Sequence, residues 1–294
     1  MGYLFLLLAV IFNLTKSYCS KKVSNKVETL SDTVNMTVAR NAFCAVIGAV
    51  LIVIGNNCNF YLSPKGFVIC LVAGLAVGLN YIVWVMSLKS GVYLMASASN
   101  SASFIVAAVG GLLFFNETLT LFKGLSILLI LLAIFFMGRY QKESYGKPNT
   151  KYILLLATVF LTAGVSSITQ KWFAKTHPDT SAHTYTFYSL LISFVILLIL
   201  SFFIKEQKTV KMRIQNIKRL LPAITLMAVC FYGTTYFQSR ASRLLEAVVM
   251  YPLLNGLLLA AGSLMAWICF KESPNKNSII GVILVFSAIM LSRL

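Results

Sequence analysis

Two asparagines in apolar stretches of the chain carry its main candidate chemistry. Asn100 lies in a run of alternating alanines and serines, and Asn255 follows Pro252 by three residues. An amide in apolar surroundings is costly and is a candidate for function, since it both donates and accepts hydrogen bonds. Hydrogen bonding between helices is the structural alternative. We expect this pair to line a cavity and bind a polar solute, and Pro252 to interrupt backbone hydrogen bonding nearby.

Aromatic and hydroxyl side chains form a second candidate group. Aromatic residues four positions apart share one helix face, and a pocket lined by them favours organic solutes. The structural alternatives are close helix packing for the serines and interface anchoring for tyrosines near helix ends. Besides the two asparagines, the predicted substrate-binding residues are Tyr81, Trp84, Ser97, Ser99, Tyr188, Tyr232, Tyr236 and Tyr251.

Charged side chains at the ends of apolar stretches form the third group. Lys16 and Lys171 occupy equivalent places, where an ammonium could attract an anionic group or act as a gate. Lysines at helix ends also commonly reach out to the membrane interface. Glu246 is the carboxylate best placed for a proton relay, although a relay is only weakly supported. Glu117 and Glu272 are expected to be structural residues that brace their loops.

Composition places these residues in a membrane. Of the 294 residues, 59% are hydrophobic and 11% charged, whereas globular domains carry about 25% charged residues. Crossing a bilayer takes about 20 mainly apolar residues, so the charge-free runs predict ten transmembrane helices. These runs are 1–15, 41–64, 66–88, 90–116, 124–138, 152–170, 180–204, 220–239, 247–270 and 277–292.

The chain repeats itself at an offset of 155 residues. Five predicted helices in each half is an odd number, so the second half enters the membrane in the opposite orientation. We predict an all-α membrane protein of ten transmembrane helices, arranged as two inverted five-helix repeats around a central cavity. The repeats are residues 1–139 and 151–294, joined by a linker at 140–150 into one integrated domain. Matching pairs include Lys16 and Lys171, Tyr81 and Tyr236, Asn100 and Asn255, and Glu117 and Glu272.

The distribution of charge bears on topology and excludes other functions. Of 25 Lys and Arg residues, 17 lie in the first, third, fifth, seventh and ninth loops between predicted helices. Lys and Arg accumulate in cytoplasmic loops, so we predict that these loops are cytoplasmic and that both termini lie outside. The same rule explains the net charge of +17, so nucleic acid is not an expected partner. The six cysteines show no metal-ligand spacing, and His177 and His183 match no helical metal pair. We expect no metal, no cofactor and no enzymatic activity.

A short motif closes the fourth predicted helix of each half: Phe-Asn-Glu-Thr at 115–118 and Phe-Lys-Glu-Ser at 270–273. With these motifs and ten helices, the chain resembles the EamA-like branch of the drug/metabolite transporter superfamily over essentially its whole length. The resemblance implies a carrier whose first four and sixth to ninth helices surround a cavity, while the fifth and tenth pack peripherally. The family usually has glycine where this chain has Asn116 and Lys271, and it keeps both termini in the cytoplasm, against the charge count.

We therefore predict an integral membrane carrier that moves a small organic metabolite by alternating access, through exchange or down a gradient. The alternative is a flippase for a lipid-linked substrate or an accessory subunit of a transport system, which a cavity open sideways to lipid would favour. The expected partners are an organic solute and membrane lipid, and the expected location is a bacterial plasma membrane. Substrate, direction, coupling ion and oligomeric state, including a homodimer, stay open.

Overall fold

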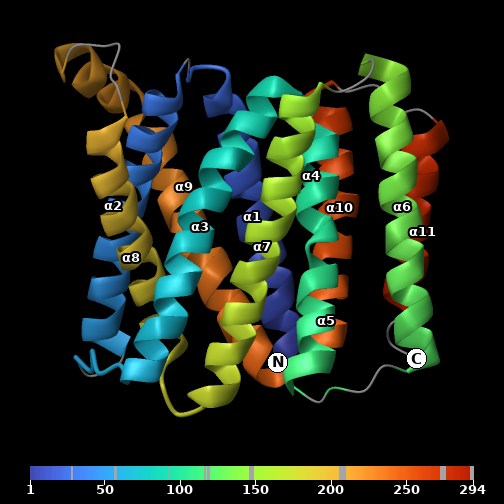
Figure 1. The fold of residues 1–294 in the computed structure, drawn as a ribbon, viewed down its shortest axis with the longest axis horizontal. Coiled ribbons are helices and arrows are strands. Elements are labelled where there is room, and N and C mark those ends of the chain that lie inside the picture. Colours follow the sequence, from blue (N-terminus) through green and yellow to red (C-terminus); the bar gives the residue numbers. More distant parts are fainter. Residues whose placement is uncertain are drawn as a thin grey trace.

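The structure, a computed structural model, describes the whole chain except residues 28, 56–57, 92, 116, 118–119, 146–148, 205–209, 272–275 and 292–294. Helices that run up and down one bundle make up most of the described part (Figure 1). They are α1 (Gly2–Ser24), α2 (Leu30–Gly55), α3 (Pro64–Ser90), α4 (Tyr93–Ala102), α5 (Phe104–Phe115), α6 (Leu121–Tyr145), α7 (Thr150–Thr176), α8 (Ala182–Phe203), α9 (Val210–Leu244), α10 (Ala247–Cys269) and α11 (Lys276–Leu291).

Ten membrane-crossing segments account for these helices within the described residues. Eight are long and apolar enough to span a bilayer when α4 and α5 are counted as one segment, Tyr93–Phe115. The other two are α6 and α11, whose apolar stretches are shorter, at Gly124–Ala133 and Lys276–Ala288. The prediction of an all-α membrane protein with ten spans is confirmed. α1 begins and α11 ends at the same end of the bundle (Figure 1).

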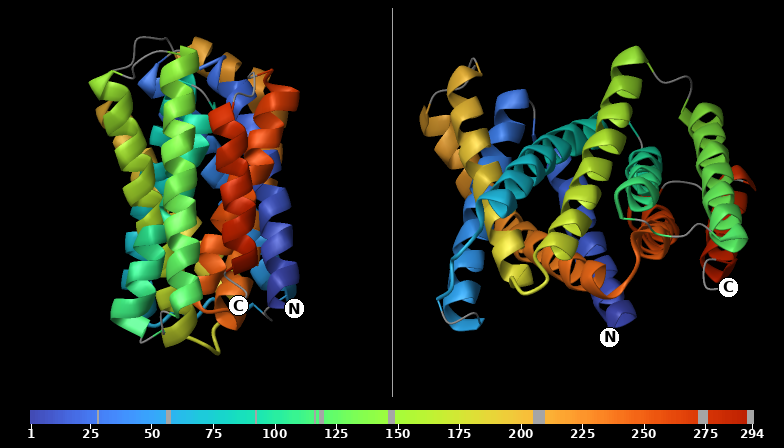
Figure 2. Two further views of the ribbon diagram at one scale, coloured as in Figure 1. Left: turned by 90° about the vertical axis from the view of Figure 1, so that its right-hand side faces the viewer. Right: turned by 60° about the horizontal axis from the view of Figure 1, so that its bottom comes forward.

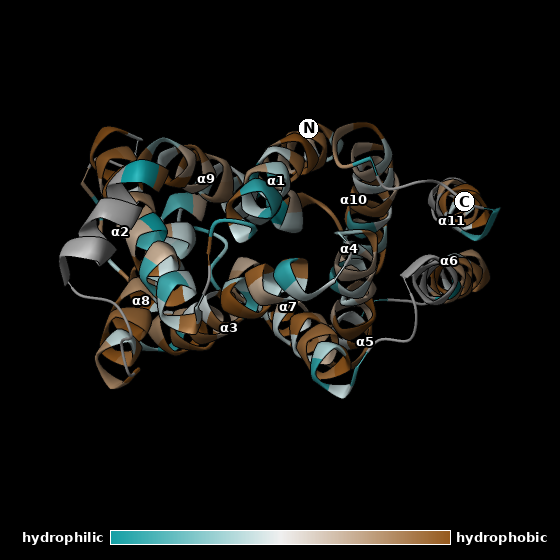
Figure 3. Ribbon diagram, turned by 90° about the horizontal axis from the view of Figure 1, so that it is seen from above, coloured by the Kyte–Doolittle hydropathy of each residue, from teal (hydrophilic) through white to brown (hydrophobic). Residues whose placement is uncertain are grey.

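Helix packing follows the predicted inverted repeat. α1 packs along α9, and its counterpart α7 packs along α3, which is the counterpart of α9. In the same way α2 packs on α8, and α6 on α11. Replacing each helix by its repeat counterpart turns the α1–α9 contact into the α7–α3 contact and leaves the α2–α8 and α6–α11 contacts unchanged. A pseudo-two-fold axis between the halves requires this pattern. The paired α6 and α11 lie at one side of the bundle, apart from the other helices (Figures 2 and 3).

Large apolar side chains cover the outer faces of the bundle. Phe202 and Phe203 at the end of α8 are each 79% exposed, and Ile268 on α10 is 76% exposed. A soluble protein rarely leaves contiguous surface of this kind uncovered. In a bilayer these side chains meet lipid tails, so the burial that stabilises the bundle is concentrated between helices.

The segment Tyr93–Phe115 is interrupted beside Asn100. α4 ends at Ala102 and α5 begins at Phe104, and the Ser103 N–H donates to the Asn100 carbonyl at 3.3 Å. In the second half, α10 continues through Pro252 as one helix. That proline lies in the second turn, where it removes only the bond to one preceding carbonyl. Serines in the first half can compete for backbone hydrogen bonds, which weakens a helix locally.

The end of α10 contains a residue in the left-handed region. Lys271, which directly follows the helix cap Phe270, has a φ of 55°. A side chain makes this conformation unfavourable by about 1–2 kcal/mol, a cost that glycine avoids. The EamA-like pattern has glycine at this position. Here the chain forms the same tight turn with lysine in place of glycine.

We expect Lys271→Gly to stabilise the protein by about 1 kcal/mol. The gain should appear as a higher melting temperature of the purified protein in detergent. Lys271→Ala is the matched control, since it also removes the charged side chain but keeps the Cβ that causes the strain. Equal melting temperatures for the two variants would contradict this explanation.

Candidate functional site

Polar side chains gather in a cavity between the two halves. Two adjoining pockets share part of their lining and so form one cavity. The first half contributes α1, α3 and α4, and the second half contributes their counterparts α7, α9 and α10. The residues common to both pockets are Asn13, Lys16, Asn80, Asn100, Phe231 and Leu258.

α2 and α8 contribute no lining residue to these two pockets. The resemblance implied that the second and seventh spans would also surround the cavity. Instead, α2 packs on α8 and α9, and α8 packs on α2 and α3, so both lie behind the helices that form the cavity wall.

The two candidate asparagines lie at this cavity. Asn100 lines both pockets, and Asn255 lines the larger one. Asn255 is 4% exposed, and its Nδ2 donates to the Tyr251 carbonyl of its own helix at 2.9 Å. This bond uses one of the two side-chain N–H groups, so the amide keeps a donor and an acceptor for a solute. The pair supplies one amide from each repeat to the same space.

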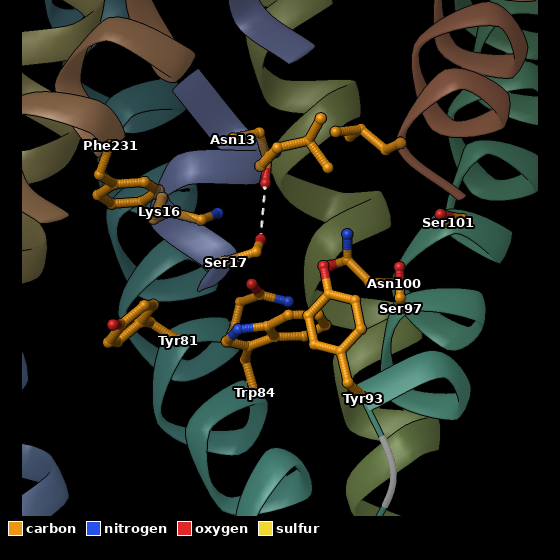
Figure 4. Close-up of a pocket in the computed structure, with 13 residues that line it drawn as sticks. Asn13, Lys16, Ser17, Tyr81, Trp84, Tyr93, Ser97, Asn100, Ser101 and Phe231 are labelled. Carbon is orange, nitrogen blue, oxygen red and sulfur yellow. Dashed lines mark hydrogen bonds between the residues drawn. The ribbon is translucent and has the colours of Figure 1, made fainter. Parts of the chain in front are cut away.

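Three other predicted residues line the cavity near Asn100. Tyr81, Trp84 and Ser97 belong to the pocket that also contains Tyr93. Trp84 and Tyr93 meet edge to face, with ring centres 6.1 Å apart. Figure 4 shows these rings on one side of the pocket, with Lys16 and Asn100 facing the same space from α1 and α4. The pocket thus combines aromatic surface with amide, hydroxyl and ammonium groups.

Two predicted residues point towards α7 instead. The Ser99 hydroxyl donates to the Leu156 carbonyl at 2.7 Å, and the Tyr251 hydroxyl donates to the Ser167 carbonyl at 2.6 Å. Successive residues of a helix point about 100° apart, so Ser99 and Asn100 face different neighbours. Both hydrogen bonds hold α7 against the broken segment or its counterpart α10.

The remaining predicted tyrosines lie around α8, outside the cavity lining. The Tyr188 hydroxyl donates to the Phe60 carbonyl at 2.7 Å. Tyr232 lies 3.0 Å from His183 Nδ1, and the Tyr236 ring stacks on the same histidine with centres 4.1 Å apart. The four-residue spacing of Tyr232 and Tyr236 correctly places them on one face of α9, but it does not tell which neighbour that face meets. α9 packs on α2 and α8 as well as on α1.

The equivalent lysines have different surroundings. Lys171 is buried, donates to the carbonyls of Ser242 and Leu245 at 3.0 and 2.6 Å, and lies 3.6 Å from Glu117. These carbonyls are at the C-terminal end of α9, where a cation is favoured. Lys16 instead lines both pockets of the cavity. The repeat therefore supplies one lysine to a helix end and the other to the cavity.

Glu117 joins the halves at the start of α10. Its two carboxylate oxygens accept hydrogen bonds from the N–H groups of Ala247 and Val248 at 3.0 and 2.9 Å. A carboxylate at a helix N-terminus satisfies otherwise unpaired donors and interacts favourably with the helix dipole. Gly111 allows this approach, because a Cβ there would lie only 2.7 Å from Glu117 Oε2.

The other two predicted carboxylates differ from Glu117. Glu246 is exposed and occupies the N-cap position of α10 without a side-chain capping bond. Glu272, the repeat partner of Glu117, lies outside the described residues. The Glu117 side chain, which is only 6% exposed, is thus a buried carboxylate whose partners the structure defines.

Arg40 is a candidate that sequence reasoning left without a role. It is fully buried on α2, and its Cζ lies 3.5 Å from the Tyr81 ring centre and 4.1 Å from that of Phe231. Both rings line the cavity, so Arg40 lies directly behind the wall. Its position directly before the predicted span 41–64 was the available signal, because a charge within a membrane helix is rare unless it has a function.

Several polar lining residues also escaped prediction. They share no motif, and a single amide or hydroxyl in an apolar run does not show which way its helix face turns. They become recognisable only when α1, α3, α7 and α9 meet around the same space. The residues are Asn13, Asn80, Ser166, Gln170 and Gln238.

Comparisons with known proteins agree with this arrangement. The model of the EamA-like transporter family matches the chain twice, at residues 1–139 and 150–294. No curated protein matches the chain. A solved structure described as "Crystal structure of protein" has a similar fold, with a TM-score of 0.74 and 9% identity, over 99% of this chain and 96% of that one. The chain is a multi-pass membrane protein that belongs to the EamA-like transporter family of the drug/metabolite transporter superfamily, whose members transport solutes and are not enzymes.

Proposed function

We propose that this protein carries a small organic solute by alternating access around the cavity between its repeats, in the plasma membrane of a bacterium. The observation that carries the proposal is the placement of Asn100 and Asn255, one from each inverted half, at a cavity lined by three helices of each half. Inverted repeats commonly place a substrate site at their interface and expose it to each side in turn. The halves 1–139 and 151–294 would rock around this site as parts of one domain.

Matching ties at opposite ends of the bundle each hold one half together during this motion. Lys171 binds carbonyls at the end of α9, and Lys21 donates to the carbonyls of Leu88 and Gly91 at the end of α3, at 2.9 and 3.3 Å. The two helix ends lie at opposite ends of the bundle (Figure 1). Each tie joins two helices of the same half, so each half can rock as a unit while the cavity opens to one side of the membrane at a time.

The alternative, a flippase for a lipid-linked substrate, would favour a cavity that opens sideways to lipid. An apolar groove does lie between α3, α7 and α8. However, Asn80 Nδ2 crosses from α3 to α7 and donates to the Val159 carbonyl at 3.2 Å and to Thr162 Oγ1 at 3.0 Å. These bonds lie between the groove and the cavity, so they support a carrier of soluble molecules over a flippase.

A transport screen with purified protein in liposomes tests this function. Vesicles loaded with unlabelled amino acids, organic acids, nucleobases, vitamins or sugars should accumulate the matching labelled compound by exchange, for at least one of these classes. The uptake should saturate, whereas protein-free vesicles should show none. A protein that fails to move any solute of these classes, yet translocates labelled lipid, would support the alternative.

We also propose that movement is by exchange or down a gradient and does not depend on protons. Glu246, the candidate proton relay, is exposed at a helix end, whereas proton-coupled carriers generally use a carboxylate inside the membrane. We therefore expect Glu246→Gln to transport at the parent rate and a pH gradient across the vesicles to drive no uptake. Uptake driven by an acidified face and abolished by Glu246→Gln would contradict this mechanism.

A further inference from the structure

Lys16 and Arg40 place two positive charges beside one aromatic ring. Lys16 Nζ lies 5.2 Å from the centre of the Phe231 ring, and Arg40 Cζ lies 4.1 Å from it. The two charges are no farther apart than the sum of these distances, which is within about one Debye length, 10 Å, at 0.1 M salt. Like charges at this separation repel each other more strongly in a protein interior than in water, because the interior screens them less.

These two charges have no acidic partner in the described part of the chain. The ion pair found there joins Lys171 to Glu117. Arg40 donates from Nε and Nη2 to the neutral amide oxygen of Asn41, at 3.1 and 2.7 Å. Its Nη1 is buried and has no hydrogen-bond partner among the described residues. The aromatic rings stabilise the guanidinium without neutralising it, so this wall of the cavity carries uncompensated positive charge.

The asymmetry of the repeat points to the same conclusion. Lys171 is used to tie α9 to α7, whereas Lys21 performs the matching task at the end of α3. Lys16, the true repeat partner of Lys171, is thereby left at the cavity, where it is only partly buried. An ammonium held in a membrane interior without a structural task is costly unless something compensates it during function.

We propose that Lys16 and Arg40 form an anion subsite, and that the carried solute is a small organic anion with a carboxylate or phosphate group. This proposal rests on the proposed function and names the solute class of the same cavity. Lys16 binds the anionic group directly. Arg40 acts from behind the wall, because it adds positive potential and holds the Tyr81 and Phe231 rings in place. Asn100 binds the polar body of the solute.

Charge-selective labelling of a cysteine in the cavity tests the subsite without knowledge of the solute. Ser166 lines the cavity with Lys16 and is partly exposed, so Ser166→Cys provides the target. Exposed Cys58 and Cys269 are first replaced by serine. In nanodiscs, where both membrane faces are accessible, the labelling rates with the anionic sulfonatoethyl and the cationic trimethylammonioethyl methanethiosulfonate are compared. We expect the anionic reagent to react faster, after correction for the reactivity of both towards a free thiol.

The expected preference should depend on one charge. Lys16→Gln should lower the ratio of anionic to cationic rates about tenfold, whereas Lys16→Arg should keep it. Lys65→Gln removes an exposed lysine at the start of α3 and is the matched control. Arg40→Gln should also lower the ratio if it folds, and the Lys16 variants decide the matter if it does not. An unchanged ratio in Lys16→Gln, or a parent that prefers the cationic reagent, would overturn the proposal.

A transport measurement separates this proposal from the proposed function. Proteoliposomes are given matched pairs, succinate with succinamide and glycerol 3-phosphate with glycerol, so that carboxylates and phosphates are tested in separate arms. Exchange of an anion but not its neutral partner supports both proposals. Transport of neutral solutes that no anion inhibits would overturn the anion subsite and leave the carrier intact. A strong anionic labelling preference in a protein that moves no solute would support the anion subsite and overturn the proposed carrier function.

Discussion

Glu117→Ala should destabilise the protein by about 3–5 kcal/mol, the usual cost of removing one partner of a buried ion pair. Both carboxylate oxygens are used, since they bind the N–H groups of Ala247 and Val248 and lie beside Lys171. The variant leaves two donors unpaired at the start of α10 and a buried ammonium without its counter-charge. Unfolding of the purified protein in mixed micelles measures the loss.

Companion variants separate the contributions. Glu117→Gln keeps the shape and one acceptor oxygen, so it should lose less than Glu117→Ala. Adding Lys171→Met to Glu117→Ala should recover part of the loss, because no isolated charge then remains buried. If Glu117→Ala unfolded within about 0.5 kcal/mol of the parent, as unremarkable surface changes do, the carboxylate would not hold the two halves together.

Asn100→Ala combined with Asn255→Ala should lower transport kcat/KM by about 100-fold or more. Losing a hydrogen-bond partner that a polar solute needs costs about 1–3 kcal/mol, which is roughly tenfold for each amide. The two losses add to about 100-fold when each amide binds the solute independently of the other. Initial exchange rates in proteoliposomes, with any solute that the screen identifies, provide the measurement.

The matched control lies one residue away. Ser99→Ala changes a side chain on α4 whose hydroxyl binds the Leu156 carbonyl of α7, so it should leave kcat/KM within a few-fold of the parent. Both variants must retain the parent melting temperature for the comparison to count. Normal transport by the double alanine variant, or an equal loss in Ser99→Ala, would remove the asparagines from the proposed site.

The spans and the repeat could be predicted because both depend on the residues of each segment and not on contacts between distant segments. A segment crosses a bilayer if its own residues are apolar over the required length, and the 155-residue offset shows in paired residues such as Asn100 and Asn255. Five spans per half then make the repeat inverted. The peripheral pairing of α6 with α11 came from the family resemblance and agrees with the structure.

Which face of each helix turns inward could not be predicted. Ser99 and Asn100 give similar signals in sequence, but one binds α7 and the other lines the cavity. Tyr232 and Tyr236 share a face, as their spacing indicates, yet that face meets His183 on α8. The rotation of a helix about its own axis depends on which helices pack against it, and those helices are distant in sequence. A helix with polar residues on several faces does not show which face meets which neighbour.

The sequence by itself determined a ten-span, inverted-repeat membrane protein, because composition, span length and the parity of the repeat require no knowledge of contacts, and its motifs identified the transporter family by resemblance. Only the tertiary structure decided how the halves differ. It placed Lys171 at the end of α9 and Lys16 in the cavity, and it stacked Arg40 between Tyr81 and Phe231. Residues at equivalent positions of a repeat look alike in sequence. In the folded protein they pack against different neighbours, so their electrostatic surroundings and their roles differ.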